Sequence, residues 1–196
     1  MLRIFTVALF LALPAMSAGA QDLQKGLAAA KRGDHVAAYR EWKPLAIQGH
    51  PRAQLYIGLS HQYGKGVTKD LGIAVQWFQS AADGGDVDAQ YRLGVLLTKG
   101  EGVRKDYTRA AAMFRRAALQ GHVKAQAFLG ALYGDGRGVI EDLETGYMWL
   151  DIASHKGSKE HQATRDKMGR FLSRSQRQRA RYRARICWAT KYEKCD

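Results

Sequence analysis

The sequence repeats itself at a fixed offset, and this repeat limits the fold more than any other feature. The dipeptide Ala53-Gln54 recurs as Ala89-Gln90 and as Ala125-Gln126, at an offset of 36 residues each time (89 − 53 = 125 − 89 = 36). The same offset aligns Gly58, Gly94 and Gly130; Asp70, Asp106 and Asp142; and Gly85, Gly121 and Gly157. A unit of this length cannot bury its apolar surface alone, so successive units must stack on one another. The repeat therefore predicts a solenoid.

Each unit is predicted to contain two helices joined by a glycine-rich loop. In the first unit we expect a helix from about Ala53 to Tyr63, which the segment 64–70 interrupts. Asp70 is the expected N-cap of the second helix, because its carboxylate can accept hydrogen bonds from free backbone amides. That second helix carries apolar side chains at helical spacing. The pair Gly84-Gly85 then ends it, since glycine adopts a left-handed backbone without strain.

The repeat also separates its residues by size. Small residues such as Gly58 and Ala74 would let two helices approach closely, whereas Ile57, Trp77 and Phe78 would fill the space between neighbouring pairs. The sequence thus predicts an all-α fold whose core runs along the whole array.

The motif shared by the units resembles that of the Sel-like repeat family, a branch of the tetratricopeptide-type solenoids. The residues that carry the resemblance are Ala125-x-x-x-Leu129-Gly130-x-x-Tyr133-x-x-Gly136-x-Gly138-Val139-x-x-Asp142, followed by Trp149 and Ala153. The match extends from Ala53 to Gly157. The resemblance implies a right-handed α-solenoid of helix-turn-helix repeats. Some secreted members of the family have been linked to penicillin binding or hydrolysis.

The sequence divides into six parts. We expect a cleaved signal peptide at 1–20, an N-terminal capping helix pair derived from a degenerate half-repeat at 21–52, repeats at 53–88, 89–124 and 125–160, and a basic C-terminal helical cap at 161–196.

The N-terminal segment has the pattern of a secretory signal. A single positive charge at Arg3 precedes an almost wholly apolar run from Ile4 to Leu13, and Ala18-Gly19-Ala20 offers a small-x-small cleavage site. The alternative, an uncleaved membrane anchor, is disfavoured because a spanning helix needs about 20 apolar residues. We therefore expect a periplasmic or secreted protein with no transmembrane segment after signal removal.

The charge balance is strongly basic, with 31 lysines and arginines against 18 acidic residues. Nucleic acid is the usual partner of such a chain, but an exported protein rarely meets any. Anionic lipid headgroups, lipopolysaccharide or an acidic protein surface suit the expected compartment better.

The two cysteines, Cys187 and Cys195, lie close to the C-terminus. An oxidising compartment favours a disulfide between them, with two free thiols as the alternative. Eight residues of continuous helix would hold their Cα atoms about 12 Å apart, too far for a bridge. A disulfide therefore requires the last helix to stop near Trp188-Ala189.

Two further helices are expected in the C-terminal cap, at about 159–172 and 174–188. The pattern Ser173-x-x-Gln176 predicts a capping box at the start of the second. Its apolar stripe, Ala180, Ala184 and Cys187, would face the array.

Signals for catalysis, cofactors and metals are weak. The Gly-x-Gly loops recur once per unit without the preceding strand of a dinucleotide site, so they are interpreted as turns. His50 and His122 occupy equivalent positions at the start of helices, and His155 and His161 lack zinc-type spacing. The sequence lacks Gly-x-Ser-x-Gly, Ser-x-x-Lys and His-Glu-x-x-His motifs. We therefore expect no catalytic residue, no cofactor and no metal.

The function that this pattern favours is an interaction scaffold that binds a protein partner on the concave face formed by the first helices. The candidate contact residues are Gln54, Tyr56, Gln90, Arg92, Gln126 and Phe128. An alternative for the three glutamines is a structural role, in hydrogen bonds between units.

A second hypothesis is a cell-envelope binder that attaches through the basic C-terminal helix to anionic lipid or glycan. Arg177, Arg181 and Arg185 are the candidate residues for that patch. The alternative interpretation of the same charges is the solvated outer face of a cap helix. A hydrolase of the secreted beta-lactamase-like kind is a third hypothesis.

Overall fold

The computed structural model describes residues 18–155 and 159–195, and it describes side chains from Leu23 onward. The expected signal segment lies mostly before these residues. The described parts fold entirely into helices and loops. The helices are α1 (Ala18–Lys31), α2 (His35–Ile47), α3 (Pro51–Tyr63), α4 (Leu71–Asp83), α5 (Val87–Lys99), α6 (Tyr107–Ala118), α7 (Val123–Asp135), α8 (Leu143–Ser154), α9 (Lys159–Gly169) and α10 (Arg174–Ala189).

The second helices begin where the repeat predicts, whereas the first helices begin two residues earlier than expected, at Pro51 in the first unit. Asp70, Asp106 and Asp142 are N-caps whose carboxylates accept hydrogen bonds from the first turns of α4, α6 and α8. The first helices of the units end at glycines with left-handed φ angles, such as 67° at Gly64 and 76° at Gly100. An L-residue with a side chain rarely adopts these angles, so the glycines stop each helix at a fixed point.

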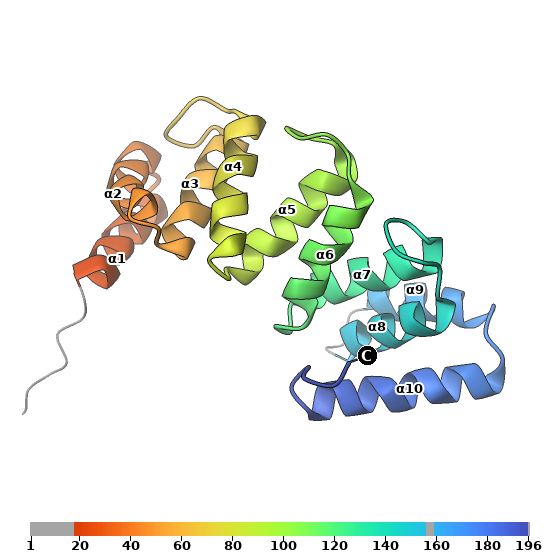
Figure 1. Cartoon of the computed structure of the whole chain (residues 1–196). Helices are drawn as coiled ribbons and strands as arrows, with labels where there is room; N and C mark the ends of the chain where they lie inside the picture. The colour runs from red at the N-terminus through yellow and green to blue at the C-terminus, as the bar shows by residue number, and fades with distance from the viewer. Residues whose placement is uncertain (1–17, 156–158, 196) are drawn as a thin grey trace, which may run out of the picture.

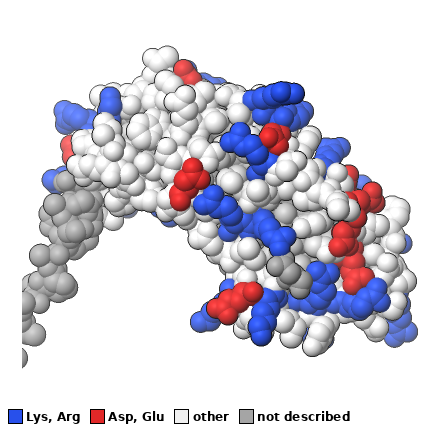
Figure 2. Space-filling model, viewed as in Figure 1, with Lys and Arg blue, Asp and Glu red and all other residues white. Residues whose placement is uncertain are grey.

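Consecutive helices pack against one another from α1 to α9, and α10 packs on α8. The helix pairs follow one another along an arch (Figure 1). The same arched outline is visible in the space-filling view (Figure 2). This arrangement is the all-α solenoid that the sequence predicts.

Within each repeat a glycine lets the two helices touch. A Cβ atom at Gly58 would lie 2.6 Å from the ring of Phe78, and one at Gly94 would lie 2.6 Å from the ring of Phe114. In the third unit Gly130 meets Leu150 in the same way, at 2.9 Å. The large side chains therefore occupy the space that the glycines leave open.

Between repeats a second set of glycines makes the contact. Gly66, Gly102 and Gly138 belong to the loops within the units, and each lies against the backbone at the start of the second helix of the preceding pair. A Cβ atom at Gly102, for example, would be 2.4 Å from the carbonyl oxygen of Leu71. Close backbone contact at these loops thus fixes how one unit stacks on the next.

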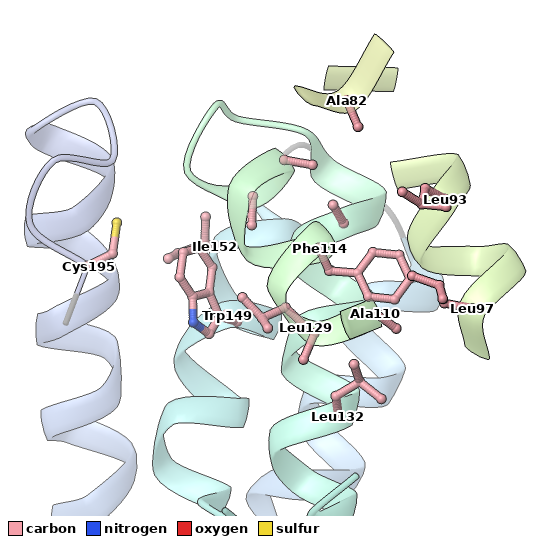
Figure 3. Close-up of a cluster of buried hydrophobic side chains, with 14 of the residues drawn as sticks. Ala82, Leu93, Leu97, Ala110, Phe114, Leu129, Leu132, Trp149, Ile152 and Cys195 are labelled. Carbon is pink, nitrogen blue, oxygen red and sulfur yellow. The ribbon is translucent and has the colours of Figure 1, made fainter. Parts of the chain in front are cut away.

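The core extends across the unit boundaries. The buried side chains run from α3 through α8 to α10 and the C-terminal tail, where Cys195 belongs to the same cluster. Figure 3 shows Leu93, Phe114, Leu129 and Trp149 from four successive helices lying side by side in this cluster. A smaller cluster around Trp42 joins α1, α2 and α3.

The N-terminal segment forms a pair of the same type as the repeats. Gly26 of α1 lies against Trp42 of α2, as Gly58 lies against Phe78. Trp42 is 36 residues before Phe78, whereas Gly26 is 32 residues before Gly58 (78 − 42 = 36; 58 − 26 = 32). The loop of this pair is therefore four residues shorter, and it lacks the Gly-x-Gly segment of the repeats.

The C-terminal cap covers the last repeat. Helices α9 and α10 both pack on α8, and residues from Thr145 to Leu150 are buried. Gly146, which replaces the alanine of the other units, leaves room for the backbone of Gly130 and for Met168 of α9. The small residue at this position thus fits the additional helix that α8 must accommodate.

The last helix begins and ends as the sequence predicts. Ser173 and Gln176 form the expected capping box, and the stripe that includes Ala180, Ala184 and Cys187 is buried. Helix α10 stops at Ala189, and the chain turns back so that Cys187 and Cys195 form a disulfide with their Cα atoms 4.4 Å apart. Helix α9 ends at Gly169, three residues before the expected Leu172.

Candidate interaction face

Two grooves open along the first helices of the units. The N-terminal groove, about 390 Å³, is lined by Leu27, Ala30, Lys31, His35, Trp42, Tyr56, Leu59, Ser60, Tyr63, Lys65 and Arg92. The central groove, about 370 Å³, is lined by Tyr91, Lys124, Ala127, Phe128, Ala131, Leu150, Glu160, His161 and Thr164. Most of these residues belong to α1, α3, α5, α7 and α9. We call the lining of both grooves the hollowed face.

Three of the six expected contact residues lie on this face. Tyr56 stacks on Trp42 with ring centroids 4.6 Å apart, and both rings line the N-terminal groove. Arg92 donates a hydrogen bond to the hydroxyl of Tyr63 at 3.3 Å, which holds its guanidinium at the edge of the same groove. Phe128 is 39% exposed and lines the central groove. A partner seated in the grooves would therefore touch all three side chains.

The three glutamines do not line either groove. Gln54, Gln90 and Gln126 are buried. Their side-chain amides donate hydrogen bonds to the carbonyl oxygens of Ala46, Ala82 and Ala118, at 3.1, 3.3 and 3.1 Å. Each acceptor lies near the end of the preceding helix. The glutamines therefore have the alternative role, because they link the last turn of one unit to the first helix of the next.

A substitution at Gln126 tests this structural role. Leucine keeps the volume but cannot donate to Ala118, so we expect Gln126→Leu to lower the free energy of unfolding by about 1 kcal/mol. Urea denaturation followed by circular dichroism measures this difference. The exposed Gln178 provides the control, since its replacement by leucine should change stability by less than about 0.5 kcal/mol. Unchanged stability of Gln126→Leu would contradict the structural assignment.

Aromatic rings form the wall between the two units that border the central groove. Tyr91 stacks on His122 with centroids 4.5 Å apart and also contacts Phe128, whose ring stacks on Phe114 at 5.1 Å. Burial raises the pKa of the Tyr91 hydroxyl above its usual value. The hydroxyl is therefore neutral at physiological pH, and it offers a hydrogen-bonding group beside an apolar wall.

His122 has a capping role at the edge of this cluster. Its Nδ1 accepts a hydrogen bond from the backbone amide of Ala125 at 3.1 Å, so the ring must be unprotonated at that nitrogen to cap α7. Its Nε2 lies 3.6 Å from Asp88, which in turn accepts a hydrogen bond from Arg52 at 2.6 Å. Burial lowers the pKa of His122 below its usual value, and the opposing effect of Asp88 is smaller.

This capping arrangement predicts that acid weakens the array. The folded protein binds a proton at His122 less readily than the unfolded chain does, so stability rises with pH in this range. The contribution of His122 is fully present above the unfolded pKa of about 6.5, and it is lost as the pH falls through the lower folded value. We expect the urea midpoint of the wild type to fall between pH 7.5 and pH 5.

The variant His122→Asn isolates this effect, because asparagine caps a helix without titrating. Lys124 and Arg92 also act electrostatically on His122, and both are unchanged in the variant. We expect the variant to lose less stability than the wild type between pH 7.5 and pH 5. Identical pH profiles for the two proteins would show that His122 contributes nothing to the acid response.

The three arginines predicted as an anionic-surface patch have contacts within the protein. Arg177 donates to the carbonyl oxygens of Gly169 and Leu172, both at 2.7 Å, and so it caps the end of α9. Arg181 donates to the hydroxyl of Tyr147 at 3.2 Å. Arg185 is exposed and lies over the ring of Tyr182.

Neighbouring arginines of α10 also have partners on α8. Arg179 pairs with Glu144 at 2.8 Å, and Arg183 donates to the hydroxyl of Thr145 at 3.2 Å. Figure 2 shows basic and acidic side chains mixed over the C-terminal part of this face of the molecule. These arginines of α10 therefore help to attach the cap, and Arg179, Arg181 and Arg185 are also exposed to solvent.

Sequence reasoning missed several residues of the hollowed face. Tyr91 aligns with Leu55 and Ala127 of the other units. An aromatic residue at a position that is aliphatic in the other units was the signal that could have identified it. Trp42 aligns with the buried Phe78, and nothing in the sequence indicates that its ring also lines a groove.

Neither a metal centre nor a membrane-crossing helix is found in the part of the chain that the structure describes. No three histidine, cysteine or acidic side chains gather there as ligands for an ion. No helix among the described residues is long and apolar enough to span a bilayer.

Comparison with known proteins identifies the repeat. A family model described as Sel1 repeat matches residues 51–86, 87–122 and 123–158. These units have the 36-residue length predicted from the sequence, with boundaries two residues earlier. No protein of curated function matches the sequence.

Two solved structures are similar to this one. A Sel1 repeat protein from Oxalobacter formigenes is 30% identical, with a TM-score of 0.71 over 79% of this chain and 63% of the other. A protective antigen present in uropathogenic Escherichia coli strains, which displays an SLR fold, is 27% identical, with a TM-score of 0.60 over 89% of this chain and 46% of the other. The chain thus spans less than two thirds of the length of either relative.

Proposed function

The chain belongs to the Sel1 repeat family, whose members are generally protein–protein interaction scaffolds, and we propose that it is an exported scaffold that binds a protein partner along its hollowed face. The fold of this family is typically a non-catalytic scaffold.

The observation that carries the proposal is the pair of grooves along the first helices. Stacked helix pairs offer an extended surface on which a partner can bind at several units at once. Tyr56 and Arg92 line the N-terminal groove, and Phe128 and Lys124 line the central groove. Each groove therefore offers an aromatic and a charged side chain. Aromatic residues and arginine supply most of the binding energy in protein interfaces.

Photo-crosslinking tests this proposal. A photoreactive phenylalanine analogue at Phe128 places the probe in the central groove, and the same residue at Ile140 places it on the loop between α7 and α8, where the side chain is 90% exposed. We expect a discrete protein adduct from position 128 in intact cells and none from position 140. The captured protein should then bind the purified chain. Equal adducts from both positions, or no adduct from position 128, would contradict the proposal.

Export to the periplasm or the medium is part of the proposal, and it is supported by the sequence of residues 1–20. A disulfide between Cys187 and Cys195 is consistent with an oxidising compartment. Mass spectrometry of the protein recovered from the periplasm or the medium should give a chain that begins at Gln21. Recovery of the full chain from the cytoplasm alone would contradict this part.

A further inference from the structure

The N-terminal groove combines an aromatic floor with a basic rim. Its floor contains the stacked rings of Trp42 and Tyr56 together with Leu27. The indole nitrogen of Trp42 donates a hydrogen bond to the carbonyl oxygen of Leu23 at 3.3 Å, which fixes the orientation of the ring. Tyr63, which is 57% exposed, extends this apolar surface toward Arg92. The floor is thus preformed and fits a flat or branched apolar side chain.

The rim of this groove is positively charged. Lys31 of α1, Lys65 of the loop after α3 and Arg92 of α5 line it from three different segments. No acidic residue is among the described residues of the lining. The two lysines are exposed, and Arg92 is held in place by the hydroxyl of Tyr63. Three cations around a recessed apolar floor create a positive potential that attracts carboxylates.

The central groove differs in this respect. Its lining includes both Lys124 and Glu160, so opposite charges face the same space. The net attraction for an anionic group is therefore weaker there than in the N-terminal groove. Charge therefore distinguishes the N-terminal groove from the central groove.

We propose that the N-terminal groove binds an acidic peptide segment of the partner, with one apolar or aromatic side chain seated on Trp42 and Tyr56 and carboxylates on both sides of it facing Lys31, Lys65 and Arg92. This inference rests on the proposed scaffold function and specifies the chemistry of the partner. A peptide fits better than a membrane surface, because the floor is recessed between helices and a flat bilayer does not reach it. The basic rim supplies orientation and association rate, and the aromatic floor supplies the desolvated contact.

Three labelled pentapeptides test the proposal with the purified protein. The first has a central phenylalanine flanked on each side by two glutamates, the second has lysines in place of the glutamates, and the third has serine in place of the phenylalanine. Fluorescence anisotropy should show the first binding at least tenfold more tightly than either of the others. Binding should weaken as salt is raised, because exposed charges are screened.

Charge reversal identifies the site. The double variant Lys31→Glu and Lys65→Glu should bind the glutamate–phenylalanine peptide at least tenfold more weakly than the wild type. The matched control, Lys69→Glu and Lys105→Glu, changes the net charge equally at exposed lysines outside the groove, and its affinity should remain within about twofold of the wild-type value. Replacing the exposed Tyr63 by serine should weaken binding severalfold without unfolding the protein.

Several results would overturn the proposal. If the two double variants lost affinity for the peptide equally, binding would depend only on the net charge of the protein. Equal binding of the serine peptide would show that the aromatic floor does not contribute to affinity. If a short single-stranded oligonucleotide bound more tightly than the peptide, the ligand of the groove would be a nucleic acid. The crosslinking experiment at Phe128 separates this inference from the proposed function. If partner capture at position 128 persists but the peptide shows no preference, the scaffold stands and the acidic-segment inference fails.

Discussion

Replacing Phe114 with alanine should lower the free energy of unfolding by about 3–5 kcal/mol, the largest loss that we expect from a single substitution. The ring of Phe114 is fully buried between α5 and α6, where it covers Gly94 and stacks on Phe128. Its removal leaves a cavity at the centre of the array, because the ring fills the space that Gly94 leaves open between the two helices. Urea denaturation of the purified protein measures the loss.

Leucine at the same position is the matched control. Leu150 is 36 residues after Phe114 and packs on Gly130 as Phe114 packs on Gly94, so the fold accepts leucine at this place in the unit. We expect Phe114→Leu to cost about 1.5 kcal/mol or less. If the leucine and alanine variants were equally unstable, the loss would come from a requirement for an aromatic ring, and the cavity explanation would be wrong.

Replacing Gly102 with alanine should cost about 3 kcal/mol for two additive reasons. The backbone of Gly102 is left-handed, with φ at 71°, a conformation that costs an L-residue with a side chain roughly 1–2 kcal/mol. The new Cβ would also lie 2.4 Å from the carbonyl oxygen of Leu71, so the loop would have to move away from the start of α4. The expected result is a lower urea midpoint and weaker coupling between the two units that meet at this loop.

Gly85 separates the two causes. Its φ of 89° is also left-handed, but a Cβ there meets no heavy atom within 4 Å. Gly85→Ala should therefore cost only the backbone term of about 1–2 kcal/mol. Equal losses at Gly85 and Gly102 would show that the contact between the loop and α4 contributes nothing to stacking.

The two positions connect stability with binding. Phe114 supports Phe128 of the central groove, and the contact at Gly102 sets the angle between neighbouring units. In a solenoid each unit contacts only its neighbours, so a change in stacking alters the surface that several units present together. Substitution of Phe114 or Gly102 should therefore weaken partner binding, although neither residue lines a groove.

The repeat determined much of the fold without tertiary information. The offset of 36 residues, the aspartates before the second helices and the glycines after the first ones specify where each helix begins and ends, because capping is a local interaction. The small residue at Gly58 also predicted a close approach of two helices, whereas only the structure shows that Phe78 of the same unit fills the space beside it. Even the turn of the chain after Ala189 followed from the spacing of the two cysteines.

The tertiary structure decided which side chains are accessible to a partner. Gln126 and Phe128 are two residues apart on the same helix, yet the glutamine is buried by the preceding unit and the phenylalanine borders a groove. Arg181 is exposed, and its guanidinium also donates to the hydroxyl of Tyr147, which is 34 residues away in another helix. Helix limits depend on interactions within a few residues, which the sequence displays directly. Exposure depends on how whole units lie on one another, and that arrangement exists only once the array has folded.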